Sequence, residues 1–169
     1  MPLARCRARL LAKPPLWLLP LGALCCPAVA SAYTCSAGIT PVAFGVYRPA
    51  DAAAKTVTGN IALKCEGSLA PGVTLLVSYR IMIGAGNSGN YTGRQMLNGT
   101  QALNYQIYRN AAGTEIWGDG LNGTTAIDDT YLLGVLAPAK NSAVYARLFT
   151  GQNVPPGSYT DTLIVTVSY

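Results

Sequence analysis

Few side chains in this sequence are of the types that enzymes use for catalysis. The chain has no histidine, which is the commonest general base and a common metal ligand. Asp128-Asp129 is the only acidic pair, and neighbouring residues on a strand point to opposite faces, so we interpret the pair as a solvated loop. Asp119 lies between glycines but lacks the DxDxDG-like spacing of a calcium loop. The sequence therefore predicts a protein that is not an enzyme, with no catalytic, metal or cofactor site.

The cysteines are better suited to structure than to chemistry. Of the five cysteines, three lie in an N-terminal segment that we expect to be removed, which leaves Cys35 and Cys65. Two cysteines in an exported chain usually pair, so we predict a Cys35–Cys65 disulfide. In the chain-entropy model such a loop contributes about 3–4 kcal/mol of stability.

The first 32 residues have the features of a signal peptide. Four basic residues precede an apolar run at 16–24, and Ala30-Ser31-Ala32 resembles a signal-peptidase site. The run is too short to span a bilayer, and the bulky Leu24 before Cys25 is unlike a lipoprotein site. We expect residues 1–32 to be cleaved and residues 33–169 to form one exported domain.

Removing this leader also removes most of the net charge. The leader contains four of the twelve basic residues and no acid, so the mature chain has eight basic and seven acidic groups. A nearly neutral domain of this kind gives no indication of nucleic acid as a partner.

Short β-like runs separated by turn residues make up the rest of the chain, without a convincing helix. The segment 84–99 is rich in glycine and asparagine, and we interpret it as turns. The expected strands lie at 39–47, 56–65, 73–83, 103–108, 131–136, 143–150 and 157–169. This number and spacing predict an all-β antiparallel sandwich, with a closed barrel as the alternative.

The last of these runs has a regular apolar alternation. Tyr159, Leu163, Val165, Val167 and Tyr169 share one face of the expected strand, on which Asp161 is the exception. A long apolar strand at the edge of a sheet invites another chain to add a strand beside it. The sequence leaves open whether this strand is paired on both sides.

The ten tyrosines and the Asn-rich turns allow a second hypothesis. Exposed tyrosines in such loops could form a carbohydrate-binding surface, although most are more typical of a sandwich core with one polar end in water. Three Asn-X-Thr sequences, at Asn90, Asn98 and Asn122, match the N-glycosylation pattern. A hydrolase with an unfamiliar carboxylate site is a third hypothesis.

Several motifs in order resemble one family. They are Cys35 with VAFGVY at 42–47, GNIALKC at 59–65, LNYQIY at 103–108, WGDG at 117–120, and GSYTD at 157–161 with the terminal run. Together they resemble the spore coat protein U domain, which is shared with subunits of archaic chaperone–usher pili.

The resemblance implies an incomplete immunoglobulin-like sandwich that is completed by a donor strand from a partner. It implies a non-enzymatic subunit of an extracellular pilus (fimbrium) or surface coat, with roles in cell adhesion and biofilm. The implied partners are a periplasmic chaperone, an outer-membrane usher and other pilin subunits, met in the periplasm before the subunit reaches the cell surface. The groove would lie between the terminal strand and the 39–47 strand. Its expected residues are Val42, Phe44, Tyr159, Leu163, Val165, Val167 and Tyr169.

One departure from polymerising pilins concerns the donor segment. With cleavage after Ala32, only Tyr33 and Thr34 precede Cys35, a reach of about 7 Å. We expect this subunit to accept a strand but not to give one, as at a terminal or minor position in a fibre.

Overall fold

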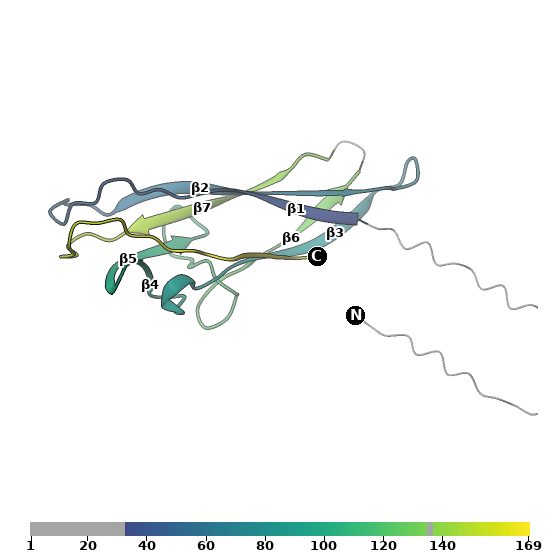
Figure 1. The fold of residues 1–169 in the computed structure, drawn as a ribbon. Coiled ribbons are helices and arrows are strands. Elements are labelled where there is room, and N and C mark those ends of the chain that lie inside the picture. The colour runs from purple at the N-terminus through teal and green to yellow at the C-terminus, as the bar shows by residue number, and fades with distance from the viewer. Residues whose placement is uncertain (1–32, 135–136) are drawn as a thin grey trace, which may run out of the picture. The chain divides into compact units, whose positions relative to one another are not determined.

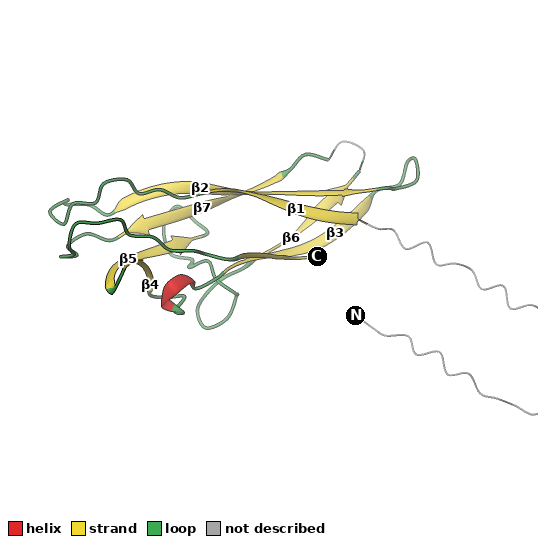
Figure 2. Cartoon of the chain, viewed as in Figure 1, coloured by secondary structure: helices red, strands yellow, loops and turns green. Residues whose placement is uncertain are grey.

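The computed structural model describes residues 33–134 and 137–169, and the expected signal peptide lies outside them. The regular structure in this part of the chain is β-strand, apart from one short 3-10 turn, η1 (Gly86–Ser88), and loops connect the strands (Figures 1 and 2). The strands are β1 (Tyr33–Thr40), β2 (Lys55–Gly67), β3 (Leu75–Ile83), β4 (Arg94–Asn98), β5 (Gln101–Tyr108), β6 (Ile127–Leu133), β7 (Lys140–Leu148) and β8 (Val165–Ser168). Among the described residues, no helix is long and apolar enough to cross a membrane.

The strands form two antiparallel sheets. The first has the order β1-β2-β7-β5-β4 and the second the order β6-β3-β8. Strand β3 shows why they pack together, because Val77, Tyr79, Ile81 and Ile83 alternate as buried residues along one face. The predicted all-β antiparallel sandwich is confirmed, with two sheets in place of a closed barrel.

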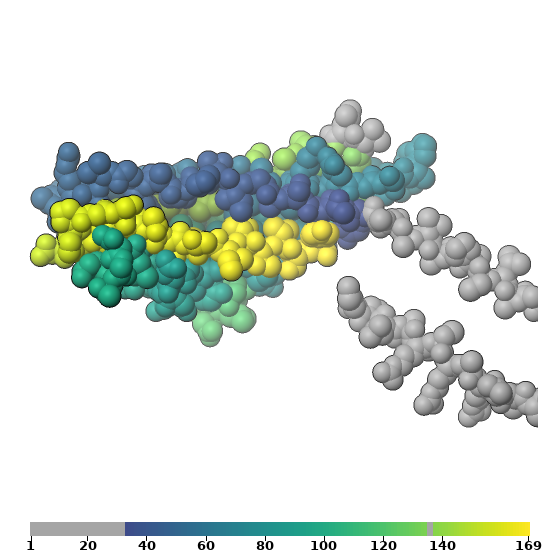
Figure 3. Space-filling view, in the orientation of Figure 1, coloured from purple at the N-terminus to yellow at the C-terminus, as the bar shows by residue number. Residues whose placement is uncertain are grey.

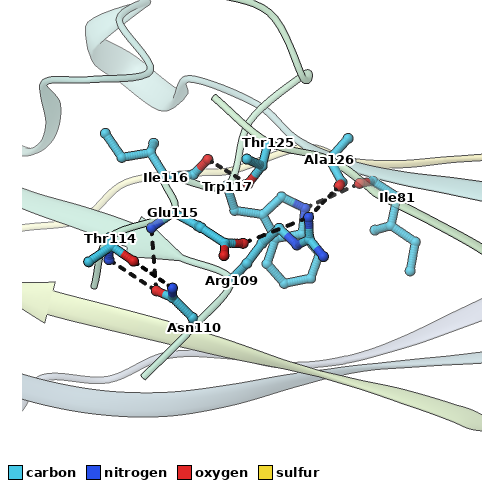
Figure 4. A network of polar contacts seen from close by, with 9 residues as sticks. All are labelled: Ile81, Arg109, Asn110, Thr114, Glu115, Ile116, Trp117, Thr125 and Ala126. Atoms are coloured by element: carbon cyan, nitrogen blue, oxygen red, sulfur yellow. Dashed lines mark hydrogen bonds and ion pairs between the residues drawn. The ribbon is translucent and has the colours of Figure 1, made fainter. Parts of the chain in front are cut away.

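A long connection between β5 and β6 closes one side of the core with Trp117. This indole is fully buried and donates from Nε1 to the carbonyl oxygen of Ile81 at 3.2 Å (Figure 4). The turn before it is held by Asn110, whose Oδ1 accepts from the backbone N–H groups of Thr114 and Glu115. The polar side chains of this connection thus satisfy its backbone, as a segment outside the ladders requires.

Several sequence-based assignments of secondary structure were wrong in their bounds or type. The strand expected at 131–136 instead begins at Ile127 and ends at Leu133, and residues 135–136 of that expectation lie outside the described ones. The 39–47 strand instead begins at Tyr33 and ends before Pro41, which has no N–H to donate to a ladder. The segment 84–99 contains strand β4 rather than turns alone. Asp128-Asp129 lies within β6, where it is exposed but paired with β3. In the segment 157–169, only β8 belongs to a ladder.

Candidate strand-acceptor groove

The disulfide fixes β1 at the edge of the first sheet. Cys35 and Cys65 are bonded, and they lie directly opposite each other in the β1–β2 ladder. The predicted disulfide is confirmed. Since β1 has no ladder partner other than β2, its outer side is an open edge of the described sheet.

The C-terminal segment, residues 157–169, passes from one sheet to the other. Thr160 exchanges backbone hydrogen bonds of 2.8 and 3.1 Å with Leu97 of β4, in the first sheet. Four residues later, the carbonyl oxygen of Ile164 accepts from the N–H of Gly84 at 2.8 Å, and β8 then pairs with β3 of the second sheet. The segment therefore bridges the two sheets along one side of the sandwich.

The hydrogen-bonding groups of β8 leave its outer edge open. The bond from Gly84 to Ile164 makes these two residues a hydrogen-bonded pair of the antiparallel ladder. Such pairs alternate with non-hydrogen-bonded ones, so the backbone N–H and C=O groups of Val165 and Val167 point away from β3. The side chains of the same two residues are half-buried against the core.

Strand β1 presents a matching edge. The Cα atoms of Cys35 and Cys65 are 4.0 Å apart, which is the close approach of a non-hydrogen-bonded pair. By the same alternation, the backbone groups of Cys35, Ala37 and Ile39 point away from β2. Strands β1 and β8, each at the edge of its sheet, thus direct a row of backbone donors and acceptors outward.

A groove lies between the continuation of β1 and the C-terminal segment. One part has a volume of about 410 Å³ and a second part, nearer the loops at 45–49 and 154–158, about 840 Å³. Val42, Phe44, Met96 and Tyr159 line both parts, which makes them one continuous channel. In Figure 3 the purple-to-blue N-terminal segment and the yellow C-terminal segment run alongside each other across the visible face.

The structure places five of the seven expected groove residues along this channel. These five are Val42, Phe44, Tyr159, Leu163 and Val165. Val167 lies beyond the channel on β8, and the half-exposed Tyr169 packs against Tyr33 with their ring centroids 5.9 Å apart. That these residues receive a strand stays a prediction.

Tyr105 of β5 forms the floor of the groove. Its ring is 6.0 Å from that of Phe44 in one wall, and its hydroxyl donates to Oδ2 of Asp161 in the other wall at 2.6 Å. Burial and this hydrogen bond both raise the pKa of Tyr105. Asp161 also accepts from the backbone N–H of Asn87 at 2.8 Å. Asp161 is the one polar residue in the apolar alternation of the terminal run, and this exception was the sequence signal for the contact. The sequence does not show that the partner of Asp161 is Tyr105.

Arg94 of β4 is a second buried polar group that sequence reasoning missed. Its side chain is fully buried and donates to Oε1 of Gln106 at 2.6 Å and to the carbonyl oxygens of Trp117 at 2.7 Å and Gly84 at 2.9 Å. Burial lowers the pKa of Arg94. The guanidinium ties β4 to the end of β3, beside the point where the C-terminal segment changes sheets.

The remaining polar candidates have structural contacts. The Asp119 carboxylate accepts from the backbone N–H of Leu121 and from Oγ1 of Thr124, both at 2.9 Å, within a turn. Within residues 33–134 and 137–169, no group of three His, Cys, Asp or Glu side chains is placed to hold a metal ion. Four of the ten tyrosines are buried, namely Tyr79, Tyr105, Tyr108 and Tyr131.

Comparison with known proteins agrees with this architecture. The family model of the Spore Coat Protein U domain matches residues 23–166. The chain belongs to this family. Protein U of Myxococcus xanthus is 32% identical to it over 139 residues, which cover 75% of this chain and 70% of that protein.

A solved structure shares the fold of this Spore Coat Protein U domain. It is the crystal structure of the CsuC–CsuE chaperone–tip adhesion subunit pre-assembly complex from archaic chaperone–usher Csu pili of Acinetobacter baumannii. The match has a TM-score of 0.54 and 20% sequence identity, and it covers 82% of this chain. The chain spans 40% of the length of the matched chain in that complex.

Proposed function

We propose that this protein is a non-enzymatic structural subunit of an extracellular pilus or surface coat. In this proposal, its groove receives a β-strand from another chain. The observation that supports it best is the pair of open strand edges, in β1 and β8, on either side of an apolar groove. Unpaired backbone groups beside apolar side chains are the features that recruit an added strand.

The walls of the groove define the chemistry of its occupant. Tyr33 packs against Tyr169 at one end, while Phe44 shares the groove lining with Tyr159 further along, so the two walls run in opposite directions. An inserted strand is therefore antiparallel to one wall and parallel to the other. Its inward side chains, at every second position, are apolar because the lining is largely apolar.

The proposed partners are a periplasmic chaperone, an outer-membrane usher and other pilin subunits. Membership of the Spore Coat Protein U family supports this proposal, as does the fold shared with a protein from a chaperone–subunit complex. The proposed route is export to the periplasm, followed by assembly at the cell surface.

The test is thermal unfolding of mature chain 33–169, purified without a chaperone, with and without a synthetic peptide of alternating apolar residues. We expect the chain alone to aggregate or to unfold near ambient temperature, and the peptide to yield a stable, cooperatively unfolding complex. A soluble monomer with one cooperative transition and a high midpoint, unchanged by the peptide, would mean that the sandwich is already complete.

A terminal or minor position in the fibre is a further part of the proposal, supported by the two residues that precede Cys35 after the expected cleavage. Cells that supply chaperone, usher and this subunit as the only pilin should form no regular fibres. Regular fibres under the electron microscope, or an N-terminus well before Tyr33 on the exported protein, would contradict this position.

A further inference from the structure

We infer that Tyr105 is a positioning residue that holds the two walls of the groove apart in the free subunit. In this role it keeps the groove open for an incoming strand. The inference rests on the proposed strand-acceptor function and concerns how the groove is kept ready before its occupant arrives.

The geometry supports such a strut because Tyr105 contacts both walls from below. Its ring packs edge-on against Phe44, which follows β1, and its hydroxyl donates to Asp161 of the C-terminal segment. The residue is 4% exposed, so most of its surface is packed in the core beneath the floor that it forms. Among the described residues, Tyr105 alone combines an aromatic contact with one wall and a side-chain hydrogen bond to the other.

The second wall needs such support because its own ladder is interrupted there. Between the bridge at Thr160 and the bond at Ile164, the C-terminal segment belongs to neither sheet. Asp161 lies in this gap, where its carboxylate accepts from Tyr105 and from the backbone N–H of Asn87. Gly86 makes room for this carboxylate, since a Cβ at that position would overlap it. Asp161 is therefore held at one point by contacts from β5 and η1.

An empty groove between two apolar walls tends to close, because closure removes apolar surface from water. A strand that pairs with both walls needs the walls to lie two strand spacings apart, which is roughly 10 Å. Only the fraction of free subunits with walls at this separation can capture a strand, so the capture rate scales with that fraction. A buried aromatic ring fixed to both walls raises this fraction of open subunits.

The test compares two matched deletions of a tyrosine hydroxyl. Tyr105→Phe removes the contact to Asp161 and keeps the ring against Phe44. Tyr79→Phe removes a similar contact, from an equally buried tyrosine to Asp129 at 3.2 Å, on a strand pair away from the groove. Each subunit is refolded by dilution, and capture of a fluorescein-labelled alternating apolar peptide is followed by anisotropy. Dissociation of the labelled peptide is then measured with an excess of unlabelled peptide.

We expect Tyr105→Phe to slow capture about tenfold, the effect of one hydrogen bond to a charged group. The rate at which the peptide dissociates from Tyr105→Phe should stay within about twofold of the wild-type value. In Tyr79→Phe, the capture rate and the dissociation rate should both stay within about twofold of the wild-type values. Equal slowing in both variants would indicate general destabilisation and overturn the inference, as would unaltered capture by Tyr105→Phe. If the wild-type subunit captures no peptide, the proposed function itself fails, and the inference fails with it.

Asp161→Asn provides a second variant in case Tyr105→Phe does not fold. The amide keeps an oxygen for the backbone donors, and its NH₂ group can donate to the tyrosine hydroxyl, so the contact across the floor is retained in reversed direction. We expect capture within about threefold of the wild-type rate. Capture about tenfold slower than the wild-type rate would mean that the charge, and not the hydrogen bond, supports the wall, and would overturn the assignment to Tyr105.

Discussion

A donor strand fused to the C-terminus should convert this chain into a stable monomer. The fusion adds a flexible linker after Tyr169 and then a segment of alternating apolar residues that returns along the groove, antiparallel to the C-terminal segment. The strand and the walls together would bury on the order of 400 Å² of apolar surface, which contributes about 10 kcal/mol at 25 cal/mol per Å². This gain is as large as the whole stability of a typical domain.

Two neighbouring substitutions test whether the gain comes from the groove. Val165 is half-buried and lines the groove, whereas Ile164 is 73% exposed on the opposite face. Val165→Asp loses the burial of a valine, about 1.5–3 kcal/mol, and leaves a carboxylate without a partner under the strand, at a further cost of several kcal/mol. Together these effects remove roughly half of the gain or more. Ile164→Asp should change stability by about 0.5 kcal/mol or less, because it alters an exposed site.

The assay is urea and thermal unfolding of the fusion and its two variants, followed by circular dichroism. We expect the Val165→Asp fusion to lose half or more of the gain and the Ile164→Asp fusion to match its parent. If both aspartates are tolerated, the fused strand does not cover Val165. If both are equally damaging, the C-terminal segment does not have the alternation described above, and the reasoning is refuted.

Three further predictions concern the scaffold, and each is measured on the fused protein. Replacing Cys35 by Ser should lower its stability to urea by about 2–5 kcal/mol and leave one free thiol detectable by mass spectrometry. Arg94→Met should cost about 3–5 kcal/mol, because the acceptors of the buried guanidinium lose their donors; an unchanged urea midpoint would contradict this. The Lys140 ammonium, 2.7 Å from Asp129, holds the pKa of that carboxyl below its ordinary value. The pair therefore stabilises fully above the unfolded pKa, about 3.9, and this contribution is lost as the pH falls through the lower folded value. Asp129→Asn should flatten the decline of the melting temperature below pH ~4, and an identical pH profile would argue against the pair.

The sequence by itself was sufficient for the features that depend on local pattern. The alternation from Tyr159 to Val167 predicted which side chains face inward, and the structure shows that alternation of half-buried and exposed residues. It could do so because successive residues of an extended chain point to opposite faces, whatever their neighbours are. The disulfide was predictable for a similar reason, since Cys35 and Cys65 are the only cysteines outside the expected leader.

Tertiary structure alone decided which edges are open and what supports them. An edge is defined by the strands that do not pair with it, and this depends on contacts between residues far apart in sequence. Strand β4 was missed because its glycine-rich surroundings favour turns, and the buried Arg94 that anchors it looks like any surface arginine in the sequence. Asp161 was visible only as an exception, because its partner Tyr105 is 56 residues away and meets it only when the sheets pack. Local patterns determine which way a side chain points, but the partner it meets is determined by the packing of the whole chain.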